Sequence, residues 1–154
     1  MIWPVTTMTD LPTIYGGQGG ARTMFDGVEY DSNTEASFAE WLKAHGCTFE
    51  RQQWYRDNGI RYKLDFAASS PIAAGTVYVE IKPRRDDMPG WLFDNRAEVD
   101  EILAKMETIW GSVPGASLAV IFWNDGDEYP RLFFLHRGYR WRLINEDQGS
   151  RLPW

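Results

Sequence analysis

The chain is poor in the residues on which zinc sites, disulfides and membrane spans depend. Its 154 residues include one cysteine, Cys47, and two histidines, His45 and His136. One cysteine excludes an internal disulfide, and two imidazoles add too few ligands for a zinc enzyme. No apolar run reaches the roughly 20 residues of a membrane span, and the opening MIWPVTTMTD lacks the regions of a signal peptide. We therefore expect a cytoplasmic protein with no membrane partner.

Positive charge is also scarce. Lysine and arginine number 16 against 22 acidic residues, which gives a net charge of −6. This balance argues against a protein that merely coats nucleic acid, because phosphate neutralisation needs basic side chains. The basic residues that are present are mostly arginines, and several are clustered. The clusters are Arg84 with Arg85, and Arg137 with Arg140 and Arg142.

The length and the absence of internal repeats predict a single domain over residues 1–154. The GGQGG stretch at 16–20 favours an irregular N-terminal arm over residues 1–29. The core then occupies 30–144, and 145–154 form a peripheral tail.

The periodicity of apolar residues predicts an α/β fold. A helix is expected over 31–46, with Ser32 as its N-cap, Glu35 in a capping-box position and Gly46 at its end. A second helix is expected over 92–110. Strands are expected at 47–54, 60–66, 77–82, 117–123, 131–136 and 139–144. This order predicts a mixed central β-sheet flanked by helices.

Two of these strands alternate between apolar and charged residues. In VYVEIKP, one face should carry Val77, Val79 and Ile81, and the other Tyr78, Glu80 and Lys82. In IRYKLDF, Ile60, Tyr62, Leu64 and Phe66 should point inward, and Arg61, Lys63 and Asp65 should share the other face.

An antiparallel hairpin of these two strands would bring charged residues together. If paired residue numbers add up to 145, Asp65 lies opposite Glu80 and Lys63 opposite Lys82. Opposed Cβ atoms are about 4.5–5.5 Å apart, so the two carboxylates need a proton or a cation such as Mg²⁺ between them. Glu35 lies on the apolar stripe of its helix, where it needs a partner unless it only caps the helix. The alternative is an ordinary solvated strand face.

The same residues resemble a known family. Asp65, fourteen intervening residues and then Glu80-Ile81-Lys82 match the D–(x)n–E-x-K core of the PD-(D/E)xK nuclease superfamily. The segment YDSNTEASFAEWLKAHG resembles the "(F/Y)-x-S-x-x-E-x-x-(F/W)-A" helix that precedes this core in small phage and transposon-type nucleases. RYKLDF resembles their "Y-x-P-D-F" strand, with Leu64 in place of proline. The resemblance covers residues 29–83.

The resemblance implies a restriction-endonuclease-like αβββαβ core and cleavage of DNA phosphodiester bonds. Asp65, Glu80 and the backbone carbonyl of Ile81 would bind Mg²⁺ or Mn²⁺. Lys82 would orient and help to deprotonate the attacking water, and Glu35 would hold a metal-bound water or a second metal. Metal ions activate water and neutralise charge on the phosphate.

Further residues are candidates for contact with DNA. They are Lys63, Gln53, Arg84 and Arg85, each of which is also compatible with an ordinary surface position. Arg137, Arg140 and Arg142 could follow a DNA backbone or belong to an ordinary edge hairpin. A homodimer and a protein partner from the same phage or mobile element are both compatible with the resemblance.

Three functions therefore remain open. The first is a Mg²⁺-dependent endodeoxyribonuclease of phage or mobile-element origin, acting on branched or replication-linked DNA. The second is a catalytically silent DNA- or protein-binding module that retains the fold. The third is a small enzyme that uses the paired carboxylates on another kind of substrate.

Overall fold

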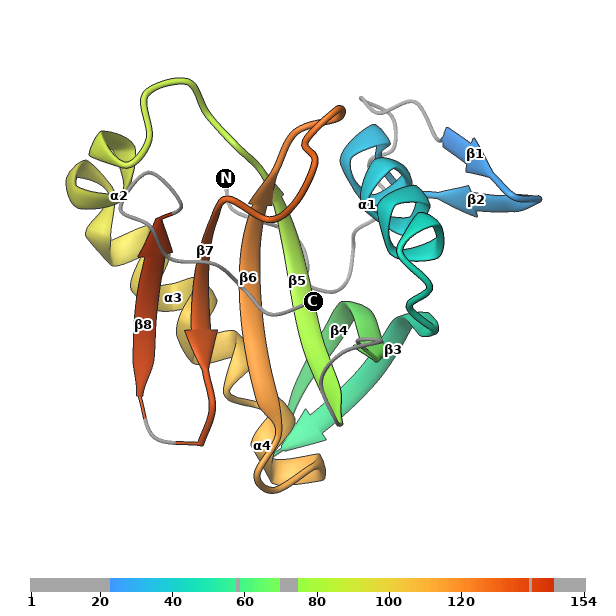
Figure 1. Cartoon of the computed structure of the whole chain (residues 1–154). Helices are drawn as coiled ribbons and strands as arrows, with labels where there is room; N and C mark the ends of the chain where they lie inside the picture. The colour runs from blue at the N-terminus through green and yellow to red at the C-terminus, as the bar shows by residue number, and fades with distance from the viewer. Residues whose placement is uncertain (1–22, 58, 70–74, 139, 146–154) are drawn as a thin grey trace.

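A six-stranded mixed sheet forms the centre of the protein (Figure 1). The computed structural model describes residues 23–57, 59–69, 75–138 and 140–145. The strands lie side by side in chain order: β3 (Phe49–Asp57), β4 (Ile60–Ser69), β5 (Thr76–Pro83), β6 (Ser117–Trp123), β7 (Leu132–His136) and β8 (Trp141–Asn145). Strands β5 and β6 are parallel, and every other neighbouring pair is antiparallel. The predicted mixed α/β sheet is confirmed.

Helices cover both faces of the sheet (Figure 1). Helix α1 (Asn33–Ala44) packs on one face. Helices α2 (Gly90–Asp94), α3 (Arg96–Met106) and α4 (Ile109–Ser112) connect β5 to β6, and α3 packs on the opposite face. The single helix expected over 92–110 is thus divided into shorter segments. No helix in the described part of the chain is long and apolar enough to cross a membrane.

Helix α1 begins and ends as its sequence predicts. Ser32 is the N-cap, and its Oγ accepts a hydrogen bond of 3.1 Å from the Glu35 N–H. At the other end Gly46 has φ +74, a left-handed conformation that glycine adopts without strain. The Cys47 N–H donates to the Leu42 carbonyl at 2.9 Å, which satisfies one of the last carbonyls of the helix.

The end of the expected N-terminal arm is regular. Strands β1 (Thr23–Phe25) and β2 (Val28–Tyr30) form a hairpin whose apolar side chains pack against the α1 side of the core. Asp26 and Gly27 both have positive φ, as in a two-residue hairpin turn. The Asp-Gly pair at these positions is typical of such a hairpin turn. Residues 1–22 of the arm, and 146–154 of the predicted tail, lie outside the described residues.

The pairing of β4 with β5 has the expected register. Phe66 pairs with Val79 and Ser69 with Thr76, and both pairs of numbers add up to 145. Strand β4 extends to Ser69, three residues beyond its expected end. The ladder stops at Phe66↔Val79, so neither expected pairing, Asp65 with Glu80 or Lys63 with Lys82, forms.

The expected alternation along β4 is wrong in one respect. Tyr62 and Leu64 pack against the α3 side of the sheet, whereas Phe66 packs against the α1 side. The change of face occurs at Asp65, next to Gln52 on β3, which has φ +55. A left-handed residue in a strand rotates the chain and interrupts the regular alternation of faces. Ile60, also expected to point inward, is 55% exposed.

Candidate active site

Strand β5 carries two charged side chains into the interior of the protein. Val77, Val79 and Ile81 join the core on the α1 side, as the alternation predicts. On the other face, Glu80 is 2% exposed and Lys82 is 7% exposed. A solvated strand face, the alternative reading of VYVEIKP, is therefore wrong. Buried charges require partners, because they have lost their hydration.

The Glu80 carboxylate is held from two sides. Lys82 Nζ lies 2.9 Å from Glu80 Oε2. The Tyr62 hydroxyl donates a hydrogen bond to Glu80 Oε1 and also lies 3.2 Å from Met106 Sδ, which places the tyrosine against α3. Both carboxylate oxygens therefore have protein partners, and the side chain has a fixed orientation.

Asp65 joins the site from the neighbouring strand. Its Oδ2 accepts a hydrogen bond of 2.8 Å from the Ile81 N–H, immediately beyond the end of the β4–β5 ladder. The side chain thus takes the place of a main-chain acceptor where the two strands separate. Burial raises the pKa of Asp65 well above its ordinary value, and the negative charges of Glu35 and Glu80 raise it further.

Glu35 reaches the same group of charges from α1. The side chain is half-buried, and loss of hydration, with repulsion from Asp31 and Glu80, raises the pKa of Glu35 to about 7. Burial lowers the pKa of Lys82, and the carboxylates Glu80, Asp65 and Glu35 oppose this shift. The four residues predicted from the sequence therefore form one electrostatically coupled group.

The chemistry of this group suits a hard divalent cation. Three carboxylates face a single ammonium group, so the site carries excess negative charge when all groups are ionised. Oxygen ligands of this kind are those preferred by Mg²⁺ and Mn²⁺. Within the described residues, however, no three Asp, Glu, His or Cys side chains are already assembled as a metal site. Glu80 would have to exchange Tyr62 or Lys82 for the cation.

The predicted DNA contacts have mixed outcomes. Lys63 is half-buried and lies 3.7 Å from Asp31 Oδ2. Gln53 is half-buried, and its Nε2 lies 3.4 Å from the Arg51 carbonyl oxygen. Both side chains therefore have partners within the protein.

The two adjacent arginines differ from each other. Arg84 is half-buried and forms an ion pair with Asp127, so its guanidinium supports the loop after β6. Arg85 is exposed, although it contacts Asp87 at 3.1 Å and stacks over Trp91 at 5.2 Å. Arg85 is the better placed of the two to meet a ligand.

Tyr62 is the site residue that the sequence analysis missed. The alternation assigned it correctly to the interior but gave it only a packing role. A buried tyrosine hydroxyl needs a hydrogen-bond partner, and Tyr62 lies only three positions from the candidate carboxylate Asp65 on the same strand. The need of a buried tyrosine for a hydrogen-bond partner could therefore have indicated that Tyr62 belongs to the site.

Comparisons with known proteins yielded no match. No family model, no curated protein and no solved structure is similar to this chain at a significant level. The function must therefore be inferred from the site.

Proposed function

We propose that this protein is a metal-dependent endonuclease of the PD-(D/E)xK type that hydrolyses DNA phosphodiester bonds. The observation that carries the proposal is the buried Glu80–Lys82 pair, coupled to Asp65 on β4 and Glu35 on α1. Buried charges seldom add net stability compared with apolar side chains. Clusters of ionisable groups with perturbed pKa values are typical of functional sites.

The topology supports the same proposal. Helix α1 is followed by the antiparallel strands β3, β4 and β5, and a helical connection leads to the parallel strand β6. This is the αβββαβ order expected from the resemblance. The motif residues lie on the elements that the family pattern assigns to them: Glu35 on the first helix, Asp65 on the second strand and Glu80 and Lys82 on the third.

In this proposal Asp65, Glu80 and the backbone carbonyl of Ile81 hold Mg²⁺ or Mn²⁺, and Glu35 completes the site. When bound, the cation would supply positive charge that activates water and stabilises the phosphate during hydrolysis. Tyr62 would keep Glu80 oriented. Lys82, whose pKa burial lowers, would release a proton from Nζ more readily than an exposed lysine.

A cleavage assay tests the proposal. Supercoiled, linear, single-stranded and four-way-branched DNA are incubated with the protein in Mg²⁺, Mn²⁺ or EDTA. We expect metal-dependent cutting, including nicking of closed circles, which requires an endonuclease. Glu80→Gln and Lys82→Met, which preserve side-chain size, should reduce the rate on the order of 10²–10⁴-fold. Lys105→Met on α3 is the control, because Lys105 pairs only with its helix neighbour Glu101.

A second function has one observation in its favour. Both Glu80 oxygens are engaged by Tyr62 and Lys82, and the described residues contain no assembled metal site. These facts fit a binding module that retains the nuclease fold without cleavage. Such a module would bind DNA equally well in EDTA and Mg²⁺ and would cut no substrate. Cutting that survives both Glu80→Gln and Lys82→Met would contradict the proposed active site.

A further inference from the structure

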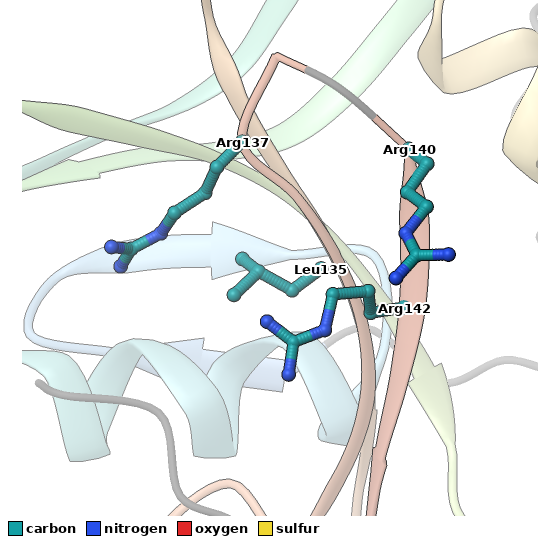
Figure 2. A pocket seen from close by; sticks show the side chains of 4 residues that line it. All are labelled: Leu135, Arg137, Arg140 and Arg142. Carbon is teal, nitrogen blue, oxygen red and sulfur yellow. The ribbon is translucent and has the colours of Figure 1, made fainter.

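The hairpin at the far edge of the sheet carries three exposed arginines around a hollow. Arg137 directly follows β7, Arg140 directly precedes β8, and Arg142 is the second residue of β8. With Leu135 they line a hollow of about 400 Å³ (Figure 2). Figure 2 shows Arg137 and Arg142 on either side of Leu135, with Arg140 beside Arg142 on the neighbouring strand.

The register of the hairpin places these side chains on one face of the sheet. Leu135 pairs with Arg142 across the strands. Leu135 is 7% exposed and belongs to the core on the α1 side, so Arg142 projects from that face beyond the core. Among the described elements, helix α1 lies over the other half of the sheet, away from β7 and β8 (Figure 1).

The described residues contribute no ion pair to any of the three arginines. Other basic residues of the described chain form ion pairs, such as Arg84 with Asp127 and Arg96 with Asp100. Within the described residues, no carboxylate lies within 4.0 Å of a nitrogen of Arg137, Arg140 or Arg142, and none lines the hollow. Three adjacent guanidinium groups repel one another, and an anion placed between them would remove this repulsion.

We propose that Arg137, Arg140 and Arg142 bind phosphates of a nucleic-acid backbone at a site separate from Glu80 and Lys82. Guanidinium groups match phosphate oxygens through paired hydrogen bonds. An open hollow lined by three of them on a sheet edge can follow successive phosphates. That the ligand is a nucleic acid and not a free phosphorylated compound rests on the proposed nuclease function. That the three arginines bind an anion does not depend on that function.

The location predicts an anchoring role. Strands β5 and β8 are three strands apart in the sheet, which corresponds to about 14 Å at the usual strand spacing. Arg142 also lies on the α1 face, whereas Glu80 and Lys82 point to the opposite face, so the cluster would contact backbone phosphates away from the cleaved bond. Its loss should weaken binding without changing the rate of cleavage at saturating DNA.

Fluorescence anisotropy with a labelled 30-base-pair duplex tests this site. The titration is done in EDTA, so that no cleavage interferes, at several salt concentrations. In the combined variant Arg137→Gln, Arg140→Gln and Arg142→Gln, the slope of log K against the logarithm of the salt concentration should decrease in magnitude by about 2.7. At 0.15 M salt this corresponds to a loss of affinity on the order of 100-fold. The control is Lys43→Gln, Arg96→Gln and Lys105→Gln, which removes the same charge elsewhere.

Each result has a defined meaning. An equal loss in the control variant, or no binding by the unsubstituted protein at any salt, overturns the proposal. Arg-dependent binding of inorganic phosphate with unchanged duplex binding shows a small-anion site and also overturns it. If the combined variant does not fold, the single substitution Arg140→Gln, at an exposed position, should still lower the slope by about 0.9. Arg-dependent binding without cleavage would refute the nuclease and leave this site intact.

Discussion

Replacing Glu35 with glutamine should change how the stability of the metal-free protein depends on pH. Burial and neighbouring carboxylates raise the pKa of Glu35 from 4.5 to about 7. The folded protein therefore binds this proton more tightly than the unfolded chain does. The contribution of Glu35 to the free energy of unfolding is greatest below pH 4.5, falls as the pH rises from 4.5 to about 7, and is constant above that range. Glutamine has no proton to lose, so the variant lacks this decline.

The magnitude follows from the same shift. A difference of about 2.5 pKa units, at about 1.4 kcal/mol per unit, sets an upper limit of about 3.5 kcal/mol. Glu35 is only half-buried, and its charge is shared with Asp31 and Glu80, so we expect about 2 kcal/mol. At pH 8.5 Glu35→Gln should be more stable than the unsubstituted protein by this amount, whereas at pH 4.5 the difference should be only about 0.4 kcal/mol.

Urea unfolding in EDTA, followed by tryptophan fluorescence between pH 4.5 and 8.5, measures the difference. Glu40→Gln is the matched control, since Glu40 lies on the same helix and is exposed. It should leave the pH dependence unchanged. Parallel curves for Glu35→Gln and the unsubstituted protein would refute the electrostatic coupling of Glu35 to the site.

Three further predictions concern the same group of residues. Tyr62→Phe should lower the free energy of unfolding by about 1–3 kcal/mol, because it leaves a buried oxygen of Glu80 without its donor. Thermal unfolding measures this change, and an unchanged melting temperature would contradict the hydrogen bond. The rate of Mg²⁺-dependent cleavage should rise with pH through about 7, as Glu35 loses the proton that competes with the metal; a rate that falls over this range would oppose the assignment. Ser32→Ala should destabilise the protein by about 1 kcal/mol through loss of the α1 cap and leave the cleavage rate unchanged, which the same two assays determine.

The sequence alone predicts the elements that depend on near neighbours. The cap at Ser32, the glycine after α1 and the alternation in β5 are local properties, and each agrees with the structure. The register of β4 with β5 also follows from the sequence, because the two strands are adjacent in the chain. The predicted pair of Asp65 with Glu80 does not form, because the ladder ends one residue earlier, and Asp65 accepts a hydrogen bond from the Ile81 N–H instead.

Only the tertiary structure decided how the charged side chains are used. The change of face at Asp65 depends on the left-handed Gln52 of the adjacent strand, which no alternating pattern within β4 encodes. The partners of Arg84 and Glu80 come from Asp127 and Tyr62, residues distant in the chain. Local periodicity assigns a residue to a face, whereas burial, pairing and pKa depend on which distant residues pack against that face. The sequence therefore determined the candidate group Glu35, Asp65, Glu80 and Lys82, and the fold alone determined its burial and its coupled charges.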